Sequence, residues 1–332
     1  CLACLVKRAT DRYPSTADLI DDLRVWLKNK ASASASDTTD VAPSVKKVVP
    51  QGLRSFAAEH QDFFLELLPG PHDREGLPKQ VRFWKTQIEE TDSDETFAVG
   101  MMYGPSGCGK SSMVMAALLP RLRHEVLPIY VEATGGDTEV RLIKALRKGC
   151  PELSADKSLP ELIADLRDRG GAHGRKVLIV LDQFEQWLHA HQASENNQLI
   201  SALRHCDGGS VQCLVLVRDD FWMSATRFMQ AIELPLLEGH NSATVDLFDK
   251  DHAGKVLAAF GRAYGKLPDL PAEPDQHQAD FLRHAADGLS DDGRVVCVRV
   301  SVFSEMMKNR PWTKDSLAEV GGTEGVGVTF LE

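Results

Sequence analysis

Continuous apolar runs alternate with helix-forming segments through the middle of the chain. The apolar runs, which we predict to be buried strands, are residues 96–104, 127–133, 177–181 and 211–217. The helix-forming segments between them are residues 113–123, 137–149 and 197–206. Strands that are apolar throughout are typical of a parallel sheet with helices on both faces. We therefore predict an α/β fold with three layers.

Different patterns flank this central part. Amphipathic helices are predicted before it, at residues 54–68 and 79–90, and short helices without further strands after about residue 250. The segment from 30 to 52 is rich in alanine, serine, threonine and proline and has no periodicity, which is typical of a linker. The predicted organisation is a helical piece at 1–29, a linker at 30–52, a core at 53–250 and a C-terminal helical and winged-helix-like region at 251–332.

The composition is that of an acidic globular protein. Of the 332 residues, 43% are hydrophobic and 26% are charged, and the formal net charge is −10. We therefore expect no binding to nucleic acid through general electrostatic attraction. No apolar run approaches the length of a membrane span. The 7 cysteines are odd in number and scattered, which argues against a disulfide framework and predicts a cytoplasmic location. The first residue is Cys1, and we expect the sequence to be a piece of a longer chain.

A glycine-rich segment follows the first predicted strand. It reads GPSGCGKSS and consists of Gly104, Pro105, Ser106, Gly107, Cys108, Gly109, Lys110, Ser111 and Ser112. Its spacing matches the Walker A pattern in full, with the strand before and the helix after that this pattern requires. Glycines allow several backbone N–H groups to converge on one phosphate, and the start of the helix adds a positive end. We predict that these residues bind nucleotide phosphates; the alternative is a strand-to-helix turn without a ligand.

Three side chains of this segment carry particular expectations. Lys110 supplies a positive charge to the β- and γ-phosphates, as a residue important for catalysis, and the Ser111 hydroxyl is a ligand for Mg²⁺. Cys108 lies beside the converging N–H groups and close to Lys110, so we expect its pKa to be lowered and its thiol to be the most reactive one. The sequence has no guanine-reading Asn/Thr-Lys-x-Asp motif, which favours ATP over GTP.

Two acidic residues follow the third predicted strand. Asp182 ends the run VLIVLD, and Glu185 comes three residues later. Ligands of parallel sheets bind at the carboxyl ends of the strands. We therefore predict that Asp182 holds Mg²⁺ through water, as a Walker B residue, and that Glu185 is the general base for an attacking water. The alternative is a pair of solvated acids at the start of a helix.

An arginine ends the fourth predicted strand, in the sequence VLVRDD. We predict that Arg218 contacts the γ-phosphate during hydrolysis, because the carboxyl end of this strand lies beside the predicted metal site. The alternative is that Arg218 pairs at the surface with Asp219 or Asp220.

Taken together, the motifs from residue 53 to residue 332 resemble the novel STAND NTPase 1 type of P-loop NTPase. The segments that carry the resemblance are GPSGCGKSSMVMAALLPRL, VLIVLDQFEQWL, LVLVRDDFW and WTKDSLAEVGGTEGVG. The last is similar to the winged-helix region of the family, with a double glycine at Gly321 and Gly322. The family also has an FFGRE-like box before the first strand. Here the box is stretched to FFLELLPGPHDRE, in which we expect residues 73–75 to replace the contact to the nucleotide.

The segment 1–29 resembles the last helices of a bacterial Ser/Thr protein kinase domain. The resemblance is carried by CLVKRATDRYPSTADLIDDLRVWL, in which Arg12 matches an arginine that supports the C-terminal lobe of these kinases. Kinases fused to a STAND module, often with WD40 repeats, are similar to planctomycete signalling proteins. The catalytic motifs of protein kinases are missing from this sequence, so we expect no kinase activity from it.

The resemblance implies a cytoplasmic signalling switch that binds and hydrolyses ATP with Mg²⁺. Protein partners are expected through flanking kinase and repeat domains, together with nucleotide-dependent self-association and no contact with nucleic acid or membrane. Two alternatives stay open. One is a P-loop motor or DNA-processing ATPase, against which the acidic charge argues. The other is a scaffold that binds ATP without hydrolysis, against which Glu185 argues.

Overall fold

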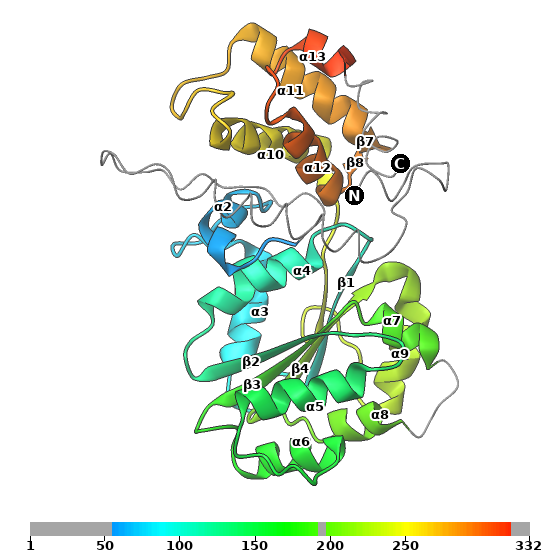
Figure 1. Ribbon diagram of the computed structural model, residues 1–332. Coiled ribbons are helices and arrows are strands. Elements are labelled where there is room, and N and C mark those ends of the chain that lie inside the picture. The colour runs from blue at the N-terminus through cyan, green and yellow to red at the C-terminus, as the bar shows by residue number, and fades with distance from the viewer. Residues whose placement is uncertain (1–54, 192–196, 320–332) are drawn as a thin grey trace, which may run out of the picture. The chain divides into compact units, whose positions relative to one another are not determined.

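The computed structural model describes residues 55–191 and 197–319 (Figure 1). The chain separates into two compact units, Cys1–Lys47 and Val48–Glu332, and the described residues belong to the second. The predicted kinase-like helices and most of the predicted linker belong to the first unit and lie outside the described residues, as do Gly321 and Gly322.

A five-stranded parallel sheet forms the centre of the described structure. Its strands are β1 (Val99–Gly104), β2 (Val126–Glu132), β3 (Lys176–Asp182), β4 (Val211–Arg218) and β5 (Ser242–Thr244). Their order is β2-β3-β4-β1-β5. The four strands predicted from apolar runs are present, which confirms the α/β fold. The sequence did not reveal β5, because a Ser-Ala-Thr strand of three residues has no apolar run.

Helices cover both faces of the sheet, because the side chains of each strand alternate between two cores. Val180 of β3 belongs to the core under α3 (Lys79–Glu89), whereas Ile179 belongs to the core on the opposite face. The helices over that opposite face are α5 (Thr138–Gly149), α6 (Leu159–Asp168), α7 (Glu185–Ala190), α8 (Gln198–Leu203) and α9 (Trp222–Ala231). This arrangement confirms the three layers. Within the described ranges, no helix has the length and apolar character needed to cross a membrane.

The helix after β1 changes its winding along its length. It starts as α4 (Lys110–Ser112), continues as the π-helical η4 (Met113–Leu118) and ends in the 3-10 turn η5 (Leu119–Arg121). Segments of π-helix are rare in proteins, and those that occur are often found at functional sites. The first predicted amphipathic helix is also divided, into η3 (Ala58–His60) and α2 (Gln61–Glu66), and both parts contact η4.

The C-terminal region combines helices with a small sheet. Its helices are α10 (Lys250–Ala263), α11 (Gln276–Leu289), α12 (Cys297–Met307) and α13 (Lys314–Glu319), and its strands are β6 (Phe248–Asp249), β7 (Ser290–Asp291) and β8 (Arg294–Val295). The strands pair antiparallel in the order β6-β8-β7. Two of these short strands, β7 and β8, lie after residue 250, where the apolar pattern predicted that the strands stop and that short helices dominate. Asp292 and Gly293 have positive φ angles of 48° and 76°, which allows a tight hairpin between strands too short to show a pattern.

Candidate nucleotide-binding site

The glycine-rich segment makes a tight turn between β1 and α4. Gly109, directly before α4, has a φ of 96°, a left-handed conformation that favours glycine. A Cβ atom at Gly104 would lie 2.0 Å from the backbone oxygen of Val245, so close packing requires glycine there as well. These two glycines let the chain turn sharply from the strand into the helix, as the Walker A pattern predicts.

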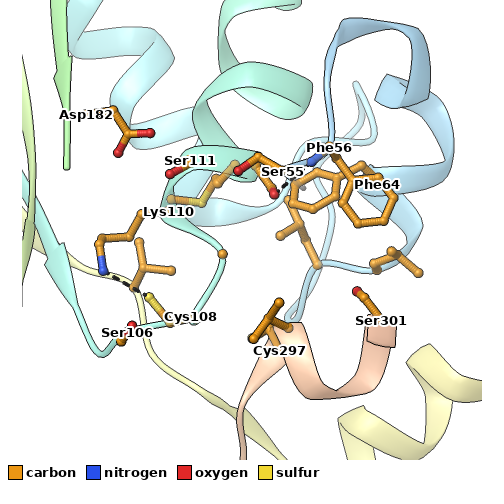
Figure 2. Close-up of a pocket in the computed structure, with 18 of the residues that line it drawn as sticks. Ser55, Phe56, Phe64, Ser106, Cys108, Lys110, Ser111, Asp182, Cys297 and Ser301 are labelled. Atoms are coloured by element: carbon orange, nitrogen blue, oxygen red, sulfur yellow. Dashed lines mark hydrogen bonds between the residues drawn. The ribbon is translucent and has the colours of Figure 1, made fainter. Parts of the chain in front are cut away.

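The side chain of Lys110 folds back over this turn (Figure 2). Its Nζ donates to the backbone oxygens of Gly104 at 2.7 Å and Pro105 at 3.0 Å, and lies 3.6 Å from the sulfur of Cys108. The ammonium group therefore has partners in the protein itself. It is held at the turn, which is where the Walker A pattern places the phosphates.

The lowered pKa that we expected for Cys108 is wrong. Its side chain is 4% exposed, and burial raises the pKa of the thiol, although the charge of Lys110 acts in the opposite direction. Burial likewise raises the pKa of Cys150 to about 11 and that of Cys297 to about 12. The free-energy penalty of burying the thiolate is larger here than the stabilisation that the neighbouring lysine provides. The ranking of thiol reactivities stays a prediction.

Asp182 ends β3 as a buried carboxylate that is 2% exposed. Its Oδ1 accepts a hydrogen bond from the backbone N–H of Gln183 at 2.8 Å, and its Oδ2 accepts one from the hydroxyl of Tyr130. Gln183 has a φ of 54°, an uncommon left-handed conformation for a residue other than glycine. The chain thus turns at the end of the strand around the carboxylate, which is not the solvated acid of the alternative interpretation.

The carboxylate of Glu185 lies at the start of α7 and is also buried, with 9% exposure. Its Oε2 has no hydrogen-bond partner among the residues that the structure describes. Burial raises the pKa of Glu185, while the charges of Lys110 and Arg218 and backbone N–H groups act in the opposite direction. A buried carboxylate with an unpaired oxygen is uncommon and is typical of functional sites.

Arg218 ends β4, but its guanidinium group is engaged elsewhere. Nε and Nη2 donate to the two carboxylate oxygens of Asp220, at 3.1 Å and 2.6 Å. The group also lies 5.8 Å from the ring centre of Phe221, in the short helix η6 (Asp219–Phe221). This pairing corresponds to the alternative interpretation of Arg218, and a contact with the γ-phosphate stays a prediction.

A cavity of about 330 Å³ brings most of the predicted site residues together. The predicted residues that line it are Ser106, Gly107, Cys108, Gly109, Lys110, Ser111, Ser112, Asp182, Glu185 and Arg218. We call this part of the cavity its polar end. Gly104 and Pro105 are not among the lining residues. The hydroxyl of Ser112 accepts a hydrogen bond from the backbone N–H of Phe56 at 3.0 Å, so it joins the helix to the segment before α2.

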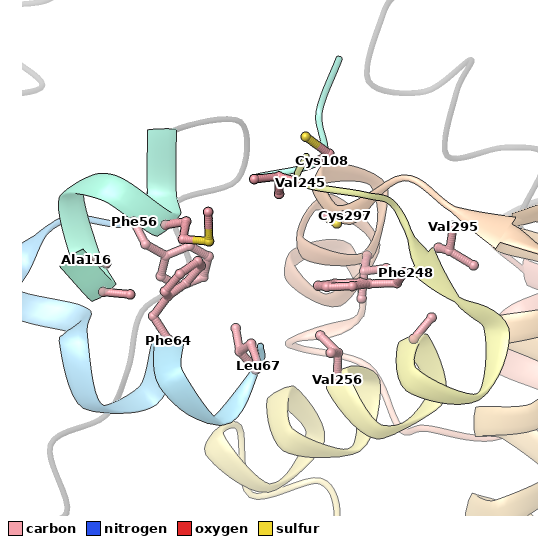
Figure 3. Packing of buried hydrophobic residues seen from close by; sticks show 14 of the residues in the cluster. Phe56, Phe64, Leu67, Cys108, Ala116, Val245, Phe248, Val256, Val295 and Cys297 are labelled. Carbon is pink, nitrogen blue, oxygen red and sulfur yellow. The ribbon is translucent and has the colours of Figure 1, made fainter. Parts of the chain in front are cut away.

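Sequence reasoning missed the apolar end of the same cavity. Its lining includes Phe56, Phe64, Leu67, Leu68 and Phe248. The rings of Phe56 and Phe64 are 5.1 Å apart, and Phe248 faces them from β6 (Figure 3). The amphipathic pattern predicted a helix over residues 54–68, the segment that contains Phe56 and Phe64. It carried no signal for a cavity, because the other wall comes from segments far away in the sequence.

The C-terminal region contacts the glycine-rich turn directly. The backbone N–H of Val298 in α12 donates to the backbone oxygen of Gly107 at 3.2 Å. A Cβ atom at Gly107 would lie 2.8 Å from the Cγ1 of Val296. Further along, Nε2 of His252 in α10 hydrogen-bonds to the backbone oxygen of Leu67 at 2.9 Å. Cys297, Val298 and Ser301 of α12 line the cavity, so α12 forms part of its wall, whereas α10 contributes no lining residue.

The segment 73–75 lies away from the cavity. Asp73 accepts hydrogen bonds from the backbone N–H groups of Leu77 at 2.9 Å and Glu75 at 2.8 Å, which lower the pKa of its carboxyl. None of the three residues lines the cavity. This placement gives no support to the expectation that they replace the nucleotide contact of the family's FFGRE-like box.

The oxygen atoms at the polar end fit Mg²⁺ only in the presence of a phosphate ligand. Within residues 55–191 and 197–319, no group of three or more His, Cys, Asp or Glu side chains could hold a metal ion. Ser111 and Asp182 offer two hard oxygen ligands. Mg²⁺ usually binds through one or two protein ligands, with phosphates and water completing its coordination.

Structural comparison finds similar folds among nucleotide-binding proteins. The Aeropyrum pernix ORC2 protein, in its complexes with ADPNP and ADP, matches with a TM-score of 0.54 and 14% identity, covering 78% of this chain and 68% of that chain. Its ADP form matches with a TM-score of 0.51 and 16% identity, covering 82% and 72%. At such identities the similarity shows the fold alone. A comparison with curated sequences finds no match.

A family model gives the more specific result. The model "Novel STAND NTPase 1" matches residues 51–257. This range includes the whole central sheet, the glycine-rich turn and α2, and ends within α10. The match covers more than half of the chain and agrees with the resemblance in the motifs. The chain therefore belongs to the novel STAND NTPase 1 family and is a P-loop NTPase.

Proposed function

We propose that this protein binds ATP in the cavity, hydrolyses it, and works as a signalling switch. The observation that carries the proposal is the division of one cavity into two ends. One end carries Lys110, Asp182 and Glu185, and the other carries Phe56 and Phe64. A triphosphate requires cations and N–H donors, whereas a purine base requires apolar and aromatic surfaces. The cavity offers both kinds of lining.

At the polar end, the turn and Lys110 would bind the phosphates. Lys110 would exchange its neutral partners, the backbone oxygens of Gly104 and Pro105, for charged phosphate oxygens, which form stronger hydrogen bonds. Ser111 and Asp182 would hold Mg²⁺. Asp182 would act through water, as a Walker B residue, with the lone pairs that its two hydrogen bonds leave available. The bound ion would neutralise part of the phosphate charge.

Hydrolysis would depend on Glu185 and Arg218. A carboxylate whose pKa is raised by burial, and whose Oε2 is free to accept a proton, suits a general base that works near neutral pH. Arg218 would contact the γ-phosphate after leaving Asp220. Nucleotide binding and the Arg218–Asp220 ion pair would then compete for one guanidinium group.

The apolar end would hold the base, and one substitution separates base binding from phosphate binding. Phe64→Leu should weaken ATP binding several-fold and leave the affinity for inorganic triphosphate unchanged. Phe303→Leu, which alters a fully buried phenylalanine of α12 that does not line the cavity, is the control for lost core packing. Equal losses for ATP and triphosphate in Phe64→Leu would contradict this assignment of the base.

The switch would act through the contact between α12 and the turn. Val298 donates to the backbone oxygen of Gly107, and the neighbouring N–H groups of the turn would bind phosphate. Loss of the γ-phosphate would therefore change the surface on which α12 packs. Through this step, α12 would carry the nucleotide state to a signalling partner or to nucleotide-dependent self-association.

The wider context of the switch rests on sequence resemblance. We propose that it follows the end of a Ser/Thr protein kinase domain in a cytoplasmic protein, with WD40 repeats and protein partners elsewhere in the parent chain. Residues 1–29 carry that resemblance. The chain described here lacks the kinase motifs and should not phosphorylate a generic basic protein in the presence of Mg-ATP.

A turnover assay tests the proposed function against its rivals. Purified protein should hydrolyse ATP in the presence of Mg²⁺, with the same rate with and without DNA. Stimulation by DNA would favour a DNA-processing ATPase, against which the net charge of −10 argues. Tight ATP binding without turnover, both alone and with DNA, would favour the non-hydrolysing scaffold.

A further inference from the structure

A tyrosine outside the Walker motifs contacts the predicted metal ligand. Tyr130 lies in β2, the strand beside β3, and its backbone pairs with Val180 two residues before Asp182. Its hydroxyl donates a hydrogen bond to Oδ2 of Asp182. The ring packs against the hydrophobic core on the face covered by α3. Replacing Tyr130 by phenylalanine would therefore remove the hydrogen bond to Asp182 and keep the ring in the core.

The second oxygen of the same carboxylate is fixed from the other side. Oδ1 of Asp182 accepts the backbone N–H of Gln183 at 2.8 Å, in the left-handed turn that follows β3. A carboxylate has about four lone-pair positions, so two donors leave about two of them for other partners. With one donor on each oxygen, rotation of the carboxylate is restricted, and the remaining lone pairs keep a fixed direction.

We propose that Tyr130 is a positioning residue for the metal site: its hydroxyl fixes the orientation in which Asp182 presents its remaining lone pairs to water bound by Mg²⁺. This inference rests on the proposed function, because it assumes that Mg²⁺ binds at Asp182 together with a nucleotide. Hydrogen-bond partners of metal ligands set ligand orientation, and their loss typically lowers metal affinity about 10- to 100-fold. Lys110 and the turn do not depend on Tyr130, so binding of nucleotide without metal should not require it.

The test measures binding of a non-hydrolysable ATP analogue by calorimetry, over a series of Mg²⁺ concentrations and in EDTA. Tyr130→Phe should raise the Mg²⁺ concentration required for half of the affinity gain about tenfold and leave the affinity in EDTA within about twofold of wild type. Tyr264→Phe is the matched control. The hydroxyl of Tyr264 in the C-terminal region donates to Oε2 of Glu305 at 3.1 Å, so this variant also breaks a partly buried tyrosine–carboxylate bond. It should change neither quantity.

A double mutant separates positioning from a general loss of stability. In the Asp182→Asn background, Tyr130→Phe should have no further effect on the Mg²⁺ requirement, because the residue through which it acts is already altered. This comparison applies even if Tyr130→Phe lowers the melting temperature, because the melting temperatures of the single and double mutants are measured in parallel.

Three results would overturn the inference. They are an unchanged Mg²⁺ requirement in Tyr130→Phe, an equal loss of affinity in EDTA and in Mg²⁺, or a full effect of Tyr130→Phe that persists with Asp182→Asn. Failure of the proposed function is distinguished by the wild-type protein. If wild type binds no analogue with or without Mg²⁺, the nucleotide site itself is refuted and the inference with it.

Discussion

Buried polar groups differ between the two ends of the strands in the central sheet. We call the side where the strands begin the amino edge and the side where they end the carboxyl edge. At the amino edge, Nε2 of Gln212 donates to Thr96 Oγ1 at 3.0 Å and to the backbone oxygen of Phe97 at 2.8 Å. Nearby, Nζ of Lys176 donates to the backbone oxygen of Glu90 at 2.6 Å. At the carboxyl edge, Oε2 of Glu185 has no partner within the described residues and its side chain lines the cavity.

The unpaired oxygens at the two edges differ in charge and in their access to the cavity. Gln212 also has one unpaired oxygen, Oε1, but that group is neutral and its side chain does not line the cavity. The unpaired oxygen of Glu185 belongs to a titratable carboxyl beside space for a ligand. Leaving a charged group unpaired costs more than leaving a neutral one, so such a group marks chemistry more strongly. Substitutions at the carboxyl edge should therefore change nucleotide chemistry, and substitutions at the amino edge should change stability.

The largest effect is expected from Lys110→Ala, which should reduce ATP affinity at least ~100-fold because a full charge facing the phosphates is lost. A modest loss of stability should accompany it, since Lys110 also donates to Gly104 and Pro105. Calorimetry with ATP provides the measurement, with Lys148→Ala on the exposed side of α5 as the control. ATP affinity within a few-fold of wild type would contradict the assignment of the phosphate site.

Glu185→Gln should keep ATP binding and lower turnover about 100-fold, because an amide cannot accept the proton of the attacking water. The pKa of Glu185 is raised, so wild-type turnover should rise as the pH passes through that value and then level off. The same shift makes the fold more stable when Glu185 is protonated. Its contribution is complete below the ordinary glutamate pKa and is lost as the pH rises through the raised value.

The two consequences of Glu185→Gln are measured separately. Steady-state turnover and denaturant unfolding, each over a pH series, should show a loss of activity together with equal or greater stability at neutral pH. Gln186→Glu, an exposed neighbour in α7, is the control for a charge change in this helix. Turnover unaffected by Glu185→Gln would move the general base to another residue, with Asp182 the next to examine.

The polar end of the cavity was predictable from the sequence because its residues are local in the chain. A strand, a turn and a helix occupy consecutive positions around Lys110, and Asp182 directly follows an apolar run. The parallel sheet then brings these positions to one edge without further information. Composition and spacing therefore predicted the sheet and the assembly of Lys110, Asp182, Glu185 and Arg218 around one cavity.

Other features depend on packing between distant segments. The apolar end joins Phe56 and Phe64 to Phe248, and the contact of Tyr130 with Asp182 depends on which strand lies beside β3. Neither arrangement has a local pattern. The raised pKa of Cys108 has the same origin, because burial comes from the surrounding fold, whereas the sequence reveals only the nearby lysine. Predictions from local spacing thus failed where solvent exclusion decides the result.

At the amino edge, Gln212→Leu should lower the free energy of unfolding by about 1–3 kcal/mol, because Thr96 and Phe97 lose a buried donor. ATP affinity should stay within about twofold of wild type. Urea unfolding and calorimetry measure the two quantities, and Gln186→Leu at the surface is the matched control. A large loss of ATP affinity at unchanged stability would break the contrast between the edges.

The smallest effect is expected from the titration of Lys176, which is 5% exposed and whose pKa burial lowers to about 8. Below that pH the lysine is charged in both the folded and the unfolded chain, so it adds no slope to stability. Between about 8 and its ordinary pKa, the unfolded chain holds a proton that the folded chain has released, and stability rises with pH. The gain should be about 1 kcal/mol between pH 8 and pH 9.

Tyrosines and thiols titrate in the same region, so the quantity to measure is the difference between wild type and Lys176→Met in urea unfolding. That difference should change with pH, whereas the difference between wild type and Lys148→Met should stay flat. A flat difference for Lys176→Met would mean that the bond to Glu90, together with the nearby carboxylates, keeps the lysine charged in the fold, and that the amino edge holds a buried ion as the carboxyl edge does.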